Sequence, residues 1–140
     1  PVLSRGLGDV YKRQILTIDD NSYTQNMEII PDPRIKDISY DIYKEQERLL
    51  LEIRDFMTDV RLFENRVSKM LEKKPKNKKH ISLDKELNTK EGTYMQPMLI
   101  DQIRYLQSML SRADQKPGKD AYDRLEELKI EFNLLKDKLG

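Results

Sequence analysis

The strongest constraint on the fold is an unbroken apolar stripe between residues 39 and 73. Its members recur at alternating spacings of four and three residues, at Ile42, Gln46, Leu49, Ile53, Phe56, Val60, Phe63, Val67 and Met70. That alternation is the heptad seam of a helix in a bundle or coiled coil. Leu50 and Met57 widen the stripe beyond a strict two-stranded seam. The pattern therefore predicts a helix at 39–73 with Ser39 as its N-cap, about 50 Å long at 1.5 Å per residue.

Two shorter stripes with the same spacing predict two further helices. The first, at 97–114, carries Leu99, Ile103, Leu106, Leu110 and Ala113. The second, at 119–139, has Asp120 as its expected N-cap and carries Ala121, Leu125, Leu128, Phe132, Leu135 and Leu139. Residues 35–140 are therefore predicted to form a mainly α fold, an antiparallel three-helix bundle. We expect the excess length of the first helix to lie at its start, near Tyr40, Tyr43 and Gln46, and residues 73–94 to form a polar connector.

Residues 15–34 predict a β-hairpin ahead of the bundle. Ile15–Ile18 is a β-prone run, Asp19–Ser22 supplies turn residues, and Tyr23–Ile30 continues the β-prone pattern. A lone hairpin is marginal in water and needs a further sheet or a helix to cover its apolar face. We therefore expect these residues to be the last hairpin of an incomplete β-domain.

The first fourteen residues have a different character. The string at 1–14 resembles translated sequencing-adapter read-through, and no pattern in it continues into the rest of the chain, so we expect it to be non-native. The alternative is a genuine basic N-terminal arm. The segment holds three basic residues and one acid, so the remaining chain has 23 basic and 24 acidic residues, a net charge of −1. Without it, a basic-domain argument for nucleic-acid binding disappears.

Residues 15–140 also resemble the C-terminal part of a bacterial protein family. The residues that carry the likeness are the run from Leu16 to Gln25, the Asp-Pro-Arg of 32–34, and the proline-containing turn at 114–122. Asn21 stands where a turn glycine would be expected in that family. The family places a sortilin-type BNR-repeat β-propeller, often labelled a glycosyl hydrolase, before such a segment. The resemblance implies that 15–34 is left over from a truncated Ig-like β-domain, that the propeller and Ig-like domain are partners upstream in the same protein, and that the protein is secreted or in the cell envelope.

No residue of this chain is predicted to be catalytic, cofactor-binding or metal-ligating. His80 is the single histidine, and with no cysteine it cannot complete a metal site, so we expect a solvated loop histidine. The five lysines between 73 and 79 could meet phosphate or anionic lipid, but a solvated charge run is the expected reading. The carboxylate pairs 19–20 and 126–127 suit a turn and a helix surface. Core packing is the expected role of Met57, Met70 and Met109, and Tyr105 and Tyr122 are expected to bury their rings at the edge of the core.

These observations predict a non-catalytic C-terminal structural or interaction module of a larger β-propeller protein. The chain contains no run of about 20 apolar residues, which a membrane span requires, and no nucleic-acid partner is expected. Two alternatives remain open. One is that the chain is the tail of an active glycoside hydrolase whose catalytic propeller lies upstream. The other is a free-standing coiled-coil adaptor that self-associates through the seam of the helix at 39–73.

Overall fold

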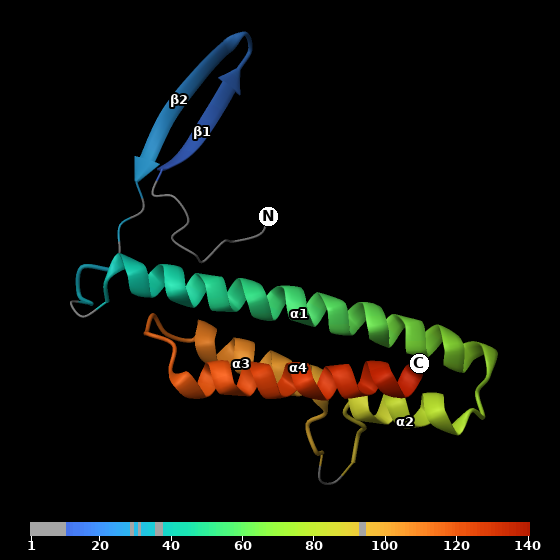
Figure 1. Cartoon of the computed structure of the whole chain (residues 1–140). Helices are drawn as coiled ribbons and strands as arrows, with labels where there is room; N and C mark the ends of the chain where they lie inside the picture. Colours follow the sequence, from blue (N-terminus) through green and yellow to red (C-terminus); the bar gives the residue numbers. More distant parts are fainter. Residues whose placement is uncertain (1–10, 29, 31, 36–37, 93–94) are drawn as a thin grey trace.

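The computed structural model describes residues 11–28, 30, 32–35, 38–92 and 95–140. Two antiparallel strands precede four helices within these residues (Figure 1). Residues 1–10 of the segment expected to be non-native lie outside the described part of the chain. The mainly helical class predicted from the sequence is confirmed. The elements are β1 Tyr11–Ile18, β2 Asn21–Glu28, α1 Tyr40–Lys73, α2 Lys78–Leu87, α3 Leu99–Ser111 and α4 Lys119–Leu139.

Helix α1 buries the predicted heptad stripe from Gln46 to Val67, but Tyr43 rather than Ile42 is buried at its start and Met70 is only half-buried at its end. The helix has 34 residues and therefore a length of about 51 Å. Ser39 is the N-cap, as expected, although its side chain makes no capping hydrogen bond. At the other end the Lys74 backbone N–H donates to the Met70 carbonyl at 3.0 Å. Pro75 follows and cannot continue the helix, because it has no N–H to donate.

The prediction of a connector at 73–94 is wrong for residues 78–87, which form helix α2. Asn77 caps α2 by accepting hydrogen bonds from the backbone N–H groups of Lys79 and His80. Leu83 and Leu87 of α2 are 1% and 0% exposed. The bundle therefore has four helices, and α2 contributes to the core rather than linking two other helices through solvent.

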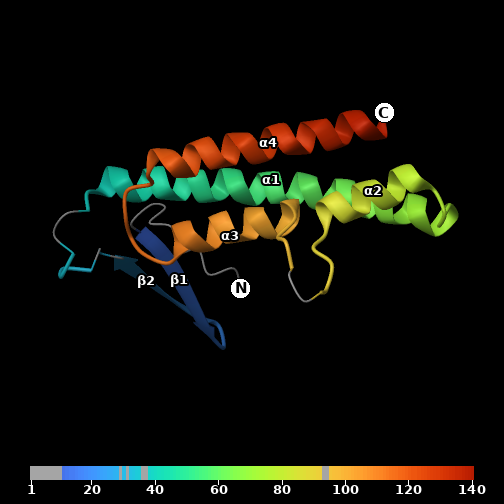
Figure 2. The same ribbon diagram turned by 90° about the horizontal axis from the view of Figure 1, so that it is seen from below.

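The four helices occupy three columns (Figures 1 and 2). Helix α1 runs the full length of the bundle, and α2 and α3 return alongside it one after the other. Helix α4 then runs parallel to α1 and completes the bundle. The expectation that α1 has an uncovered excess at its start is wrong. Tyr43 and Gln46 are buried there, and the Gln46 amide Nε2 donates to the carbonyls of Leu110 (2.6 Å) and Ala113 (2.8 Å).

One hydrophobic core joins all four helices. The predicted stripes of α1, α3 and α4 account for most of it, and Leu50 and Met57 pack against its edge as expected. Phe132 of α4 meets Phe56 and Phe63 of α1 edge to face, with ring centroids 5.7 and 5.4 Å apart. The buried cluster comprises Leu49, Ile53, Phe56, Val60, Phe63, Val67, Leu83, Leu87, Leu99, Ile100, Ile103, Leu106, Leu110, Ala121, Leu125, Leu128, Phe132 and Leu135.

The ends of the shorter helices differ from the expected positions. Helix α3 is shorter than the predicted 97–114, and Ala113 lies beyond its end and is exposed. Met98 is the N-cap of α3, and its backbone N–H donates to the Thr89 hydroxyl at 3.0 Å. Helix α4 has the predicted bounds, but Gly118 rather than Asp120 is its N-cap. Asp120 lies in the first turn, where the helix dipole favours a carboxylate.

Strands β1 and β2 form a two-stranded ribbon that stands apart from the helices (Figure 1). Their register pairs Tyr11 with Glu28 and Ile18 with Asn21. The turn is therefore shorter than the predicted 19–22. Asp19 adopts the left-handed conformation (φ 51°), and Asn21 belongs to β2 instead of standing in for a turn glycine. Strand β1 also begins inside the segment 1–14, so residue 15 is not a boundary of the ribbon.

Candidate functional site

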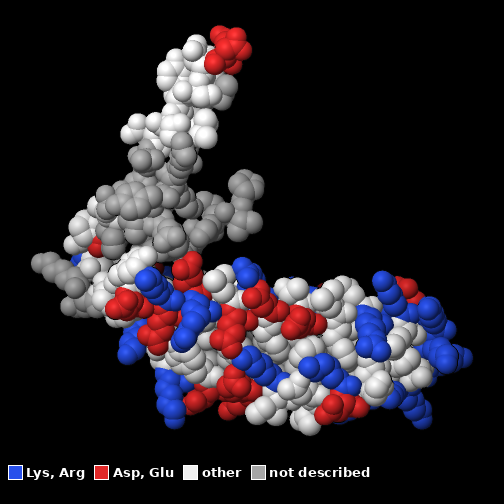
Figure 3. Space-filling model, turned by 45° about the horizontal axis from the view of Figure 1, so that its top comes forward, with Lys and Arg blue, Asp and Glu red and all other residues white. Residues whose placement is uncertain are grey.

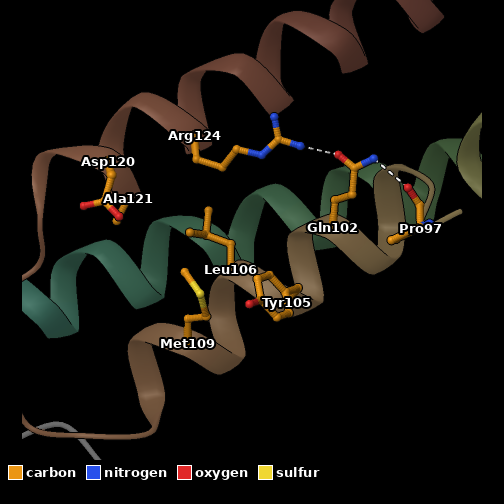
Figure 4. Close-up of a pocket in the computed structure, with 8 residues that line it drawn as sticks. All are labelled: Pro97, Gln102, Tyr105, Leu106, Met109, Asp120, Ala121 and Arg124. Carbon is orange, nitrogen blue, oxygen red and sulfur yellow. Dashed lines mark hydrogen bonds between the residues drawn. The ribbon is translucent and has the colours of Figure 1, made fainter.

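A groove lies between α3 and α4 in the described part of the structure. Its volume is about 460 Å³. Leu106 is buried at the floor of the groove, whereas Tyr105 is 62% exposed beside it (Figure 4). The lining residues are Pro97, Gln102, Tyr105, Leu106, Met109, Asp120, Ala121 and Arg124.

The polar groups of this groove are largely engaged with one another. The Arg124 guanidinium donates to the Gln102 side-chain oxygen, and the Gln102 Nε2 donates to the Pro97 carbonyl at 2.7 Å (Figure 4). Arg124 also pairs with Glu127 at 2.7 Å. The groove therefore offers an apolar contact surface with a fixed polar rim.

Sequence reasoning did not find this groove. Tyr105 was expected to bury its ring at the core edge, and that prediction is wrong because the groove leaves the side chain 62% exposed. Met109, at 36% exposed, lies one helical turn further along α3. The i, i+4 spacing of Tyr105 and Met109 was visible in the sequence. Whether that pair faces a neighbouring helix or an open groove depends on where α4 lies.

His80 is not the solvated loop histidine expected from the sequence. It lies in the first turn of α2 and is half-buried. Its backbone N–H donates to the Asn77 side-chain oxygen at 3.2 Å, and its ring Nδ1 is buried without a hydrogen-bond partner among the described residues. The described part of the chain contains no group of three or more residues that could hold a metal ion. His80 therefore belongs to the packing of α2 against the bundle.

The carboxylate pairs singled out in the sequence do not converge on a site. Glu126 lies 2.7 Å from the Lys129 ammonium, whereas Glu127 lies 2.7 Å from Arg124. Asp19 and Asp20 form the turn of the ribbon. Each pair therefore has a structural role on the surface. Tyr122, in contrast, has the predicted position, half-buried with its hydroxyl donating to Glu45 at 2.8 Å.

Polar contacts hold residues 88–90 against α2 and α3, and they shift the pKa of two carboxyl groups. The Thr89 side chain hydrogen-bonds the Asp101 carboxylate, which lowers the pKa of Asp101, and Arg104 adds to this effect. Burial raises the pKa of Asp84, but the hydrogen bonds from Lys90 (2.6 Å) and Asn88 (2.9 Å) outweigh it, so the pKa lies below its ordinary value. These contacts connect the end of α2 to the start of α3.

A second surface feature is the concentration of lysine and arginine where α1 meets α2 (Figure 3). We call residues 66–79 the basic end. A shallow hollow of about 680 Å³ opens beside it on the outer face of α1. That hollow is lined by Leu62, Asn65, Arg66, Lys69, Met70 and Lys73. The lysines expected to lie in a polar connector are therefore carried on two helices and the turn between them.

Comparison with known proteins adds no assignment. No protein-family model, no curated protein and no solved structure matches this chain. Within the described residues, no helix is both long enough and apolar enough to span a membrane.

Proposed function

We propose that this chain is a non-catalytic structural or interaction module at the C-terminus of a larger protein, one with a sortilin-type β-propeller. The single observation that supports this most is the isolation of the ribbon. No Cα of β1 or β2 lies within 8 Å of a helix among the described elements. Within the described elements, the backbone of the ribbon therefore makes no close approach to the bundle.

The exposed side chains of the ribbon support a docking role. Tyr23 lies directly opposite Leu16, and Ile18 is two residues from Leu16, so Ile18 and Tyr23 lie on the same face of the ribbon. Their side chains are 54% and 58% exposed. Ile15 lies on the opposite face and is 61% exposed. An isolated two-stranded ribbon is marginally stable in water, so further strands or a packed domain would stabilise it. The remainder of an Ig-like domain is the partner that we propose for it.

The buried core of the bundle supports a self-contained module. The seam of α1 that could have driven self-association is buried against α2, α3 and α4 of the same chain. Ile53 and Val60 are both 0% exposed. This arrangement favours a self-contained bundle over a coiled-coil adaptor that pairs through the same seam. Size-exclusion chromatography with light scattering should therefore give a monomer, whereas a dimer that dissociates on mutating Ile53 would favour the adaptor.

The proposal as a whole is tested by sequencing the source DNA upstream of the codon for Ile15. An open frame that continues into β-rich repeats, in place of residues 1–14, is the expected result. A start codon directly before residues 1–14 would overturn the proposal. At the protein level, amide hydrogen exchange of β1 and β2 should be fast in this chain and slow in a longer polypeptide that includes the upstream domain. Equal exchange in both would mean that the ribbon docks on nothing upstream.

A further inference from the structure

We propose that the basic end of the bundle docks on a surface of anionic phospholipid. This inference is independent of the proposed upstream domain, because it concerns the opposite end of α1. The ribbon joins the bundle near Tyr40, and the basic end surrounds Lys73, about 51 Å away along the helix (Figure 1). The bundle would then act as a spacer between a folded domain and a lipid surface.

The charge of the chain is distributed unevenly. The chain has a formal net charge of only +1, yet residues 66–79 contain seven basic side chains and a single acid, Glu72. The other residues contain 19 basic and 24 acidic side chains, a net charge of −5. The balanced total therefore conceals a +6 patch at one end of the molecule (Figure 3). Such a separation of charge orients a protein in the field of an anionic surface.

The lysines of this patch are also free to meet a partner. Lys73, Lys74, Lys76 and Lys78 are exposed, and none forms an ion pair with another described residue. Cations along the sides of the bundle differ in this respect. Lys129, for example, lies 2.6 Å from Glu52 and 2.7 Å from Glu126.

The turn that carries the lysines is held in place from both sides. Asn77 caps α2 through two backbone N–H groups at 3.0 and 3.2 Å. The Lys79 ammonium donates to the Leu139 carbonyl at the end of α4, at 2.9 Å. Leu83 anchors α2 one turn further on, at 1% exposed. The lysines are therefore presented by a folded end of the bundle rather than by a connector free to change shape.

The side chains beside the lysines favour lipid over nucleic acid. Leu62 is 64% exposed, and it lines the hollow on α1 together with Met70 and the cations Arg66, Lys69 and Lys73. An apolar side chain among cations can enter the boundary between headgroups and acyl chains while the cations meet phosphate. Residues 64–79 contain no aromatic side chain on which a base could stack.

The test uses co-sedimentation to measure binding of the full chain to vesicles of phosphatidylcholine, with and without phosphatidylserine. We expect binding only to the phosphatidylserine vesicles, weakening as salt is raised. In the test variant, glutamine replaces each of Lys73, Lys74, Lys76 and Lys78. Its partition coefficient should fall roughly 100-fold or more, because each lysine near an anionic surface contributes about a fivefold gain.

A matched control removes the same number of charges from the other end of the bundle. Glutamine there replaces the exposed residues Lys44, Arg112, Lys116 and Lys119. Vesicle binding by this control should stay within about threefold of the native chain, since its charges lie several Debye lengths from the basic end. An equal loss in both variants would show that overall charge alone drives binding and would overturn the proposal.

A third variant separates lipid from nucleic acid. Leu62→Gln leaves the charge unchanged and alters an exposed position, so the fold should be kept. We expect vesicle binding to weaken about three- to tenfold, since the lost leucine no longer inserts. Binding of the native chain to duplex DNA but not to phosphatidylserine vesicles at the same salt concentration would overturn the proposal. So would vesicle binding that Leu62→Gln leaves unchanged.

Discussion

Replacing Leu87 by alanine tests whether α2 belongs to the core. Leu87 is 0% exposed, so the substitution removes three carbon atoms from a fully buried side chain. At about 0.8 kcal/mol per buried CH₂ group, the transfer contribution alone is about 2.4 kcal/mol. Incomplete collapse of the cavity adds to this, which gives an expected loss of about 3–4 kcal/mol in the free energy of unfolding. For a chain of this size the melting temperature should fall by roughly 10 °C.

The assay is urea denaturation followed by circular dichroism, with a thermal melt as a second measurement. The control is Lys85→Ala, which changes an exposed residue of the same helix. Because alanine has the higher helix propensity, this control should leave the stability within about 0.5 kcal/mol of the native chain. If Leu87→Ala is as mild as the control, α2 does not pack on α1 and α4, and the core has three helices.

Three further predictions concern polar side-chain contacts. Gln46→Leu should lower the free energy of unfolding in urea by about 1–3 kcal/mol, because two carbonyls near the end of α3 lose their donor; an unchanged stability would show that water replaces the amide. The hydrogen bond from Thr89 lowers the pKa of Asp101 below its ordinary value of 3.8. The resulting stabilisation of the folded chain is fully present above pH 3.8 and is lost as pH falls through the lowered pKa. Acid titration of Asp101→Asn should therefore give a shallower decline, and a decline as steep as in the native chain would contradict this. Burial and the hydrogen bond to Glu45 raise the pKa of Tyr122 above its ordinary value of 10.0. The stabilisation that the neutral Tyr122 gives the folded chain is therefore present below pH 10.0 and is lost as pH rises through the raised pKa. Tyr122→Phe should flatten the alkaline melting curve, and an unaltered curve would refute the assignment.

Helix α2 shows where sequence reasoning reached its limit. Leu83 and Leu87 have the i, i+4 spacing of one helix face, but the run before them is dominated by lysine. Two buried leucines in ten residues are a weak periodic signal. What makes this segment a helix is the length of α1, whose apolar stripe continues through Phe63 and Val67 and needs a cover. Only the packed bundle shows that α2 supplies it.

The candidate sites also include features that the sequence predicted and features that it did not. The positions of Tyr122 and of the α4 stripe were predictable, because they follow from the phase of a strong heptad pattern. The groove at Tyr105 and the half-buried side chain of His80 were not predictable. Both depend on how closely neighbouring helices approach, which residue spacing along one helix does not specify. The basic end was predictable only in part. The sequence shows the cluster of lysines, but not that a folded end of the bundle places them beside Leu62.

The amino-acid sequence by itself determined the three strongest helices, most of their buried faces and the extended character of residues 15–18 and 23–28. It did so because the heptad period, proline positions and turn residues act locally on the backbone. The tertiary structure alone decided the role of α2, the burial of Gln46 against the end of α3 and the separation of the ribbon from the bundle. Those features depend on which surfaces remain uncovered once the long helix has formed, and apolar surface is buried by whichever segment can reach it.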